Sequence, residues 1–174
     1  MMSRNLTLGS LFDGSGGFPL GGLLCGIKPK WASEIELFPI RVNTKRLPQV
    51  KHLGAINKIN GGEIEPVDII TFGSPCTGLS LAGKREGLED YRSNLFYQAI
   101  RIIKEMRCKT NGEYPKYAVW ENVPGAFSSN KGKTSKPSLN QSQLSAKRKY
   151  LFLNLKNGEM QERLWEMAIP LVWS

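Results

Sequence analysis

Cys76 and Glu121 are the two residues whose types and settings are best suited to covalent chemistry. Cys76 lies in G-S-P-C-T-G-L-S (73–80), directly after an apolar run, and Glu121 begins E-N-V-P-G (121–125), directly after a second such run. A free thiol is only a few per cent ionised at neutral pH, so a nucleophilic cysteine needs surroundings that stabilise its anion. The alternatives are a buried structural thiol for Cys76 and a helix-capping or loop-ordering acid for Glu121.

A glycine-rich segment, F-D-G-S-G-G-F (12–18), could bring the backbone close to a nucleotide. Glu34 and Glu36 follow about twenty residues later, where an acidic side chain can hold ribose hydroxyl groups. Asp68 precedes a buried apolar run and could accept a hydrogen bond from an adenine amino group, or cap the entry to that strand. The glycine spacing departs from G-x-G-x-x-G, so a plain glycine-rich turn is the alternative.

Strands and helices alternate along the chain, which predicts an α/β fold with a mostly parallel sheet. Strands are expected at 6–12, 29–35, 67–72 and 117–120, helices at 37–45 and 93–107, and a loop feeding a short helix at 16–26. In such sheets, sites form at the carboxyl ends of the strands. The three motifs are therefore expected to meet at one edge.

The composition of the 174 residues fits one domain, or one domain with a tail. A net charge of +9 suits a polyanionic partner such as nucleic acid. Three unevenly spaced cysteines form neither a disulfide framework nor a zinc pattern, which favours a reduced compartment. Because no apolar run approaches 18 residues and M-M-S-R-N does not resemble a signal peptide, we expect a cytoplasmic protein without a membrane partner and without a metal.

The order L-F-D-G-S-G-G-F, G-S-P-C-T-G-L-S and W-E-N-V-P-G resembles the DNA (cytosine-5) methyltransferases over residues 6 to about 132. The resemblance implies a Rossmann-like fold that binds S-adenosyl-L-methionine, and a restriction–modification setting. The cofactor-binding residues that it implies are Phe12, Gly14, Gly16, Gly17, Glu34, Ile35, Asp68, Ile69, Pro75 and Leu95. Two positions depart from the family pattern: Ile35 stands where a tryptophan often stacks on adenine, and Thr77 replaces the usual glutamine.

The resemblance also implies a reaction. Cys76 would attack C6 of a cytosine, Glu121 would protonate or hydrogen-bond N3, and C5 would then accept the methyl group. Because C6 is unreachable inside a duplex, the partner would be double-stranded DNA with the target cytosine flipped out. A tRNA cytosine-5 methyltransferase uses the same motifs and is an alternative.

Residues 133–174 do not resemble the family. Complete members continue with an arginine motif, further strands and a target-recognition domain, so the fold is expected to be incomplete at the C-terminus. Back-translation around Gly132 and through W-E-M-A (165–168) permits family-like text in a shifted frame. We therefore expect a partial catalytic domain at 1–132 and a frameshifted, poorly ordered tail at 133–174. Such a chain could be an inactive fragment, or a cofactor-binding half that pairs with a separately encoded C-terminal half.

Overall fold

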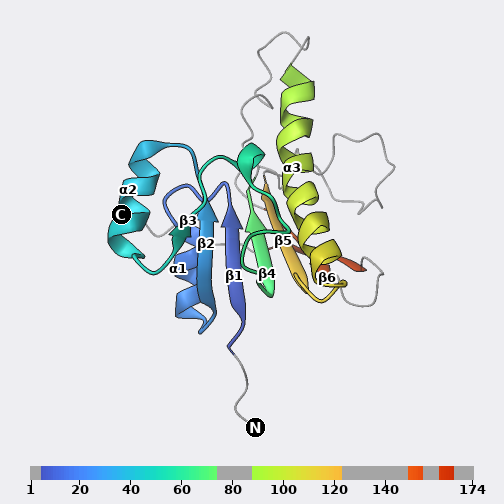
Figure 1. Cartoon of the computed structure of the whole chain (residues 1–174), viewed down its shortest axis with the longest axis horizontal. Helices are drawn as coiled ribbons and strands as arrows, with labels where there is room; N and C mark the ends of the chain where they lie inside the picture. The colour runs from blue at the N-terminus through green and yellow to red at the C-terminus, as the bar shows by residue number, and fades with distance from the viewer. Residues whose placement is uncertain (1–4, 74–87, 123–148, 155–160, 167–174) are drawn as a thin grey trace.

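The computed structural model describes residues 5–73, 88–122, 149–154 and 161–166, with side chains described at 5–73 and 95–121 (Figure 1). Its elements are β1 (Thr7–Leu11), α1 (Gly17–Leu24), β2 (Lys28–Ser33), α2 (Leu37–Arg46), β3 (Lys51–His52), the 3-10 helix η1 (Ile56–Lys58), β4 (Ile69–Phe72), α3 (Leu88–Lys109), β5 (Tyr117–Asn122), β6 (Lys149–Asn154) and β7 (Gln161–Glu166). The strand order is β3-β2-β1-β4-β5-β6-β7. All pairings from β3 to β5 are parallel, which confirms the predicted mostly parallel α/β fold.

The elements cover the two faces of the sheet unequally. Helix α3 crosses β4 and β5 on one face, while α1 packs on β1 and β2 from the other (Figure 1). Because successive strand residues point to opposite faces, Trp31 of β2 enters the core under α3, and Ala32 packs with Leu47 and Val50 on the opposite side.

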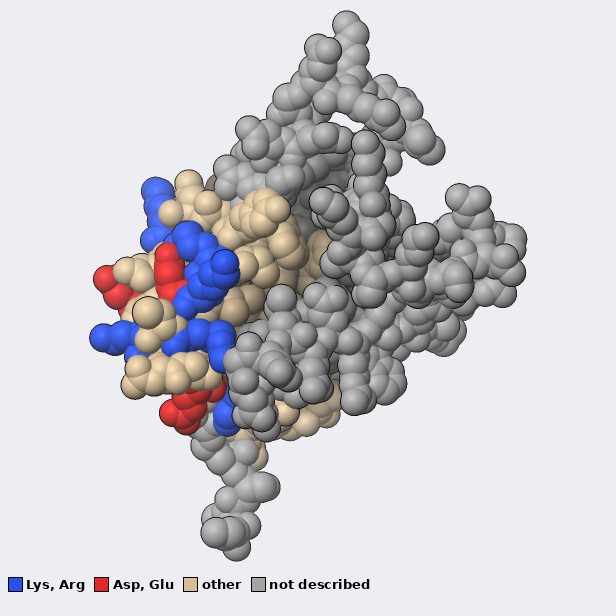
Figure 2. All heavy atoms as spheres, turned by 90° about the vertical axis from the view of Figure 1, so that its right-hand side faces the viewer, with Lys and Arg blue, Asp and Glu red and all other residues tan. Residues whose placement is uncertain are grey.

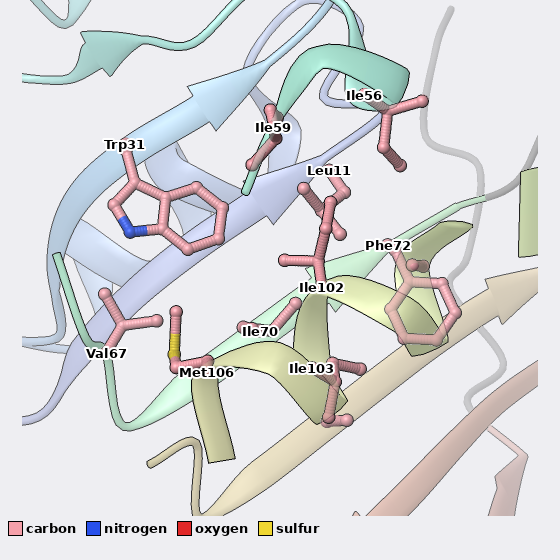
Figure 3. Packing of buried hydrophobic residues seen from close by; sticks show 12 residues of the cluster. Leu11, Trp31, Ile56, Ile59, Val67, Ile70, Phe72, Ile102, Ile103 and Met106 are labelled. Carbon is pink, nitrogen blue, oxygen red and sulfur yellow. The ribbon is translucent and has the colours of Figure 1, made fainter. Parts of the chain in front are cut away.

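The main core lies between the sheet, α3 and η1 (Figure 3). The apolar stripe predicted for the long helix supplies Ala99, Ile102, Ile103 and Met106, all of them buried. The Trp31 ring fills the space that a side chain on Gly9 would need, so the small residue in β1 lets two neighbouring strands share this core. The period of the apolar residues thus accounts for the face of α3 that packs against the sheet.

The structure differs from the sequence prediction at several boundaries. Helix α3 begins at Leu88, five residues before the predicted start at Ser93, and β5 extends to Asn122, so Glu121 lies within the strand. The sequence predicted neither β3 nor η1, which are too short to show a periodic pattern. Within the tail, 149–154 and 161–166 form the antiparallel strands β6 and β7, where no regular element was expected. The boundary at residue 132 stays a prediction.

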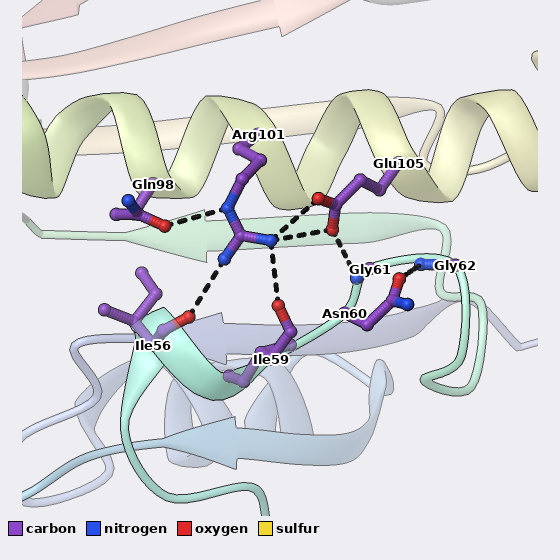
Figure 4. A network of polar contacts seen from close by, with 8 residues as sticks. All are labelled: Ile56, Ile59, Asn60, Gly61, Gly62, Gln98, Arg101 and Glu105. Atoms are coloured by element: carbon purple, nitrogen blue, oxygen red, sulfur yellow. Dashed lines mark hydrogen bonds and ion pairs between the residues drawn. The ribbon is translucent and has the colours of Figure 1, made fainter.

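One polar network holds the connection between β3 and β4 against α3 (Figure 4). The guanidinium of Arg101 donates to the carbonyl oxygens of Ile56 (3.2 Å) and Ile59 (2.9 Å) and forms an ion pair with Glu105. Glu105 in turn accepts a hydrogen bond of 2.7 Å from the backbone N–H of Gly61. Burial opposes ionisation of Glu105, but Arg101 and this N–H outweigh it and hold the pKa of Glu105 below its ordinary value.

We expect Arg101→Met to lower the free energy of unfolding by about 1–2 kcal/mol, because the carbonyl groups of Ile56 and Ile59 lose the guanidinium as a donor and Glu105 loses its ion-pair partner. Urea denaturation followed by circular dichroism measures the change. The control is Lys104→Met, an exposed residue of the same helix, which should change stability by less than about 0.5 kcal/mol. Equal effects of the two variants would contradict a specific role for the Arg101 network.

Candidate cofactor and active site

The carboxyl ends of the five parallel strands bring most of the sequence-predicted residues to one edge of the sheet (Figure 1). The glycine segment follows β1, Glu34 follows β2, Gly73 follows β4, and Glu121 lies near the end of β5. Parallel strands connected by helices end on the same side, so residues far apart in sequence become neighbours there. The described residues thus bring the glycine segment, Glu34 and Glu121 to one edge, while the motif that carries Cys76 lies outside the described residues and its place there stays a prediction.

The glycine segment has a backbone shape that few residues adopt. Phe12, Gly14 and Gly16 have φ angles of 54°, 55° and 86°. A left-handed conformation is strained for an aromatic residue, and such strain is concentrated at functional sites. The Phe12 side chain packs against the main core, which helps to hold it in place. A Cβ added to Gly14 or Gly17 would meet no atom within 4 Å, so the loop presents open backbone surface.

Glu34 is fixed to this loop by backbone hydrogen bonds. Its Oε2 accepts from the N–H of Gly14 at 2.8 Å, and its Oε1 accepts from the N–H groups of Ile35 at 2.7 Å and Glu36 at 3.0 Å. The Ile35 side chain beside it is 65% exposed. A carboxylate and an exposed apolar side chain therefore border the glycine loop.

A fourth segment reaches this edge that sequence reasoning missed. The N–H of Leu53 donates to the carbonyl of Ala32 at 2.9 Å, and the hydroxyl of Ser33 donates to the carbonyl of Gly54 at 2.7 Å. Gly54 has a φ of 73°, so the chain turns sharply just after β3. The only available signal was this glycine after a two-residue strand, which is too weak a pattern to predict.

Asp68 and Ile69 do not belong to this site. Asp68 is completely buried at the start of β4, where its Oδ2 accepts from the N–H (3.0 Å) and hydroxyl (2.9 Å) of Thr7. Its Oδ1 pairs with the ammonium of Lys116 at 2.9 Å. Thr7 is the first residue of β1 and Lys116 directly precedes β5, so the cluster joins the amino ends of β1, β4 and β5. The prediction that Asp68 and Ile69 contact adenine is therefore wrong, because residues that begin a parallel strand lie at the opposite edge from those that end it.

Glu121 lies next to the chain that leads to Cys76. A Cβ added to Gly73 would come within 2.9 Å of Oε2 of Glu121. Gly73 is the last described residue before 74–87, and Pro75, Cys76 and Thr77 lie outside the described residues. The stacked rings of Phe72 and Trp120, with centroids 6.4 Å apart, pack these two strand ends together.

Leu95 lies on α3 and packs against the main core. It lies in the N-terminal half of that helix, which spans Leu88–Lys109. Leu95 is half-buried in this packing, and its predicted position near the cofactor stays a prediction.

The described surface shows no block of one charge on the face drawn in Figure 2, where basic and acidic side chains are interspersed. Within the described ranges, no helix is long and apolar enough to cross a membrane.

Comparisons with known proteins relate this chain to DNA methyltransferases. The model of the C-5 cytosine-specific DNA methylase family matches residues 6–144. The DNA N-6-adenine-methyltransferase of Escherichia phage P1 is 36% identical in an alignment 132 residues long, which covers 72% of this chain and 18% of that protein. The type II methyltransferase M1.ScrFI of Lactococcus lactis subsp. cremoris is 38% identical over 131 residues, covering 75% of this chain and 32% of the relative.

A solved structure gives the same result for the fold. An E. coli prophage protein assigned as a DNA modification methyltransferase superposes with a TM-score of 0.55 and 28% identity, over 70% of this chain and 33% of that one. The chain thus spans about a third or less of the length of these relatives. Most of this chain matches part of a longer methyltransferase fold, and the chain belongs to the C-5 cytosine-specific DNA methylase family.

Proposed function

We propose that this chain carries the cofactor-binding and nucleophilic part of a DNA (cytosine-5) methyltransferase, which transfers a methyl group from S-adenosyl-L-methionine to C5 of cytosine. The observation that carries the proposal is the convergence at one sheet edge of the strained glycine loop, Glu34 and Glu121. Since the chain spans a third or less of the length of the relatives above, we propose that turnover on DNA also needs the parts of the methyltransferase fold that lie outside this match.

The residues present fit the cofactor. The open backbone at Gly14 and Gly17 leaves room for the methionine portion, and Glu34 can accept from ribose hydroxyl groups. Oε1 of Glu34 already accepts two backbone bonds and Oε2 accepts one, so Oε2 has the greater remaining capacity. The exposed Ile35 offers an apolar surface for adenine. When bound, S-adenosyl-L-methionine supplies an electrophilic methyl group.

The chain's own residues account for the activation of cytosine. The Cys76 thiolate adds to C6, and Glu121, acting as an acid, gives a proton or a hydrogen bond to N3, so that negative charge does not build up on the ring. This makes C5 nucleophilic. After methylation, a base removes the C5 proton and the bond from sulfur to C6 breaks, which releases the thiolate. A three-residue connection spans at most about 10 Å, which supports placing Cys76 within reach of the base beside Glu121.

A covalent trap tests this proposal. The chain, with S-adenosyl-L-methionine and the C-terminal part of a relative, is incubated with duplex DNA whose target cytosine is 5-fluorocytosine. Because fluorine at C5 cannot leave as a proton would, the adduct persists, and we expect mass spectrometry to find it on Cys76. RNA of the same sequence distinguishes a tRNA-type enzyme.

Two variants serve as controls for the trap. Cys76→Ala should abolish the adduct, whereas Cys108→Ala, which removes an exposed thiol on α3, should leave it unchanged. Cofactor binding without any adduct would indicate a non-catalytic cofactor-binding half, and an adduct on Cys25 or Cys108 would contradict the proposed nucleophile.

A further inference from the structure

A buried polar cluster lies directly beneath the glycine loop and takes no part in the reaction described above. It consists of Ser10, Asp13 and Asn43, which are 0%, 6% and 2% exposed. The amide Nδ2 of Asn43 donates to Oδ2 of Asp13 at 2.8 Å and to the carbonyl oxygen of Gly14 at 2.9 Å. The Asn43 amide oxygen occupies the space that a side chain on Gly16 would need. Asn43 of α2 therefore holds Asp13 and Gly14 of the glycine loop together from below.

Several oxygens of this cluster lack partners. Oδ1 of Asp13, Oγ of Ser10 and Oδ1 of Asn43 are buried and accept or donate no hydrogen bond among the residues that the structure describes. Buried carboxylates are normally paired with a cation or fully hydrogen-bonded, as Asp68 is with Lys116. Asp13 thus differs from Asp68, which is the other acid that is buried among the side chains the structure describes.

The electrical surroundings of Asp13 are also unusual. Across the described ranges, the charged group that acts on it is Glu34, a second anion, while β1 contributes Ser10 and α2 contributes Asn43. Burial raises the pKa of Asp13 to about 6 from its ordinary 3.8, and Glu34 adds to the rise, while the polar hydroxyl of nearby Ser10 and the hydrogen bond from Asn43 oppose it. A positive charge bound nearby would offset both the unfavourable burial of the Asp13 carboxylate and its repulsion by Glu34.

We infer that Asp13, held by Asn43, makes the glycine loop selective for the cationic cofactor S-adenosyl-L-methionine over its uncharged-sulfur product, S-adenosyl-L-homocysteine. The inference rests on the proposed function. The sulfur of the cofactor is bonded to the same ribose whose hydroxyl groups Glu34 would hold, and Glu34 is hydrogen-bonded to Gly14, the neighbour of Asp13. Transfer of the methyl group removes the sulfonium charge, so the attraction to Asp13 ends with the reaction and favours product release.

The charge argument predicts a pH dependence that the two ligands do not share. A bound cation favours ionised Asp13, so affinity for S-adenosyl-L-methionine should rise as the pH rises from 5 to 7, whereas affinity for the product should change little. We expect the ratio of the two affinities to increase by roughly three- to tenfold over this range. Both ligands carry the same α-amino and carboxyl groups, so the ratio cancels their titration.

Isothermal titration of the full chain with each ligand at pH 5, 6 and 7 tests the inference. The wild-type ratio should rise with pH, and Asp13→Asn, which keeps an acceptor for Asn43, should give a flat ratio. Glu36→Gln removes an exposed carboxylate from the same edge and should retain the rise. A rising ratio in Asp13→Asn, or a flat one in the wild type, would overturn the inference while leaving the proposed function intact.

A second measurement needs no variant. At pH 5.5, titrations in buffers of different ionisation enthalpy should show proton release when S-adenosyl-L-methionine binds and little release when the product binds. Equal release for both would overturn the inference. If neither ligand binds at any pH, the proposed cofactor site itself fails, and the inference fails with it.

Discussion

Asp68→Ala is expected to lower the free energy of unfolding by about 3 kcal/mol while leaving the cofactor affinity of the folded chain unchanged. The carboxylate is completely buried. It joins β4 to Thr7, the first residue of β1, and to Lys116, the residue before β5. Its removal leaves the N–H and hydroxyl of Thr7 without their acceptor and separates Lys116 from its counter-ion. The cluster lies at the amino edge of the sheet, away from the glycine loop, which is why binding should not change.

The contribution of Asp68 should depend on pH in a defined direction. Burial opposes its ionisation, but the bonds from Lys116 and Thr7 outweigh burial and hold the pKa of Asp68 below its ordinary 3.8. An acid whose pKa is lower in the folded chain than in the unfolded chain stabilises the fold at pH values above its unfolded pKa. This stabilisation is lost as the pH falls below about 4. The difference between wild type and Asp68→Ala should therefore shrink in acid.

Urea denaturation at pH 7 and pH 3.5 measures both effects. Glu65→Gln is the matched control, because Glu65 pairs with Lys30 at the surface and its side chain is 55% exposed. An exposed pair contributes little, so this variant should change stability by less than about 1 kcal/mol. A loss of cofactor affinity in Asp68→Ala at a temperature where it is folded would restore Asp68 to the binding site and contradict its structural assignment.

Glu34→Gln is expected to have the opposite profile, with cofactor affinity reduced by roughly 10- to 100-fold and little loss of stability. A ribose hydroxyl donates a stronger hydrogen bond to a carboxylate than to an amide, and a difference of about 1.4–2.8 kcal/mol corresponds to this range. The side chain is only partly buried, so the variant does not place an unpaired group in the core. Isothermal titration gives the affinity, and thermal denaturation checks the fold.

The neighbouring Glu36 provides a charge-matched control for this variant. It is the N-cap residue directly before α2 and is exposed, and no backbone N–H of the glycine loop is bonded to its carboxylate. Glu36→Gln should therefore reduce cofactor affinity by less than about threefold. Equal losses in the two variants would show that general negative charge, rather than the geometry of Glu34, governs binding.

The sequence predicted the features that depend on local patterns. The apolar stripe of α3 predicted a helix and the β-branched run of β4 predicted a strand. Both patterns arise because burial on one helix face or within a sheet selects apolar residues at characteristic positions. The order of elements then predicted that the glycine loop, Glu34 and Glu121 follow strands that end at the same edge. That part of the site could be predicted because a parallel sheet converts sequence order into spatial position.

Asp68 shows where residue type alone misled. An acidic residue beside a buried strand suits either a ligand site or a structural cluster, and its position before the strand rather than after it decides between the edges. The short β3 and its Leu53–Gly54 turn were missed because two residues carry no period, and their position depends on hydrogen bonds to Ala32 and Ser33.

The sequence by itself determined the family, the alternation of strands and helices, and the chemistry that Cys76 and Glu121 would perform, since these depend on motif order and residue type. Only the tertiary structure showed that Asn43 holds Asp13 beneath the loop, 30 residues away in the chain. It alone assigned Asp68 to the amino edge, bonded to a residue 61 positions earlier. The physical reason is that burial and hydrogen bonding between distant residues arise from packing of the sheet against its helices, which no local pattern records.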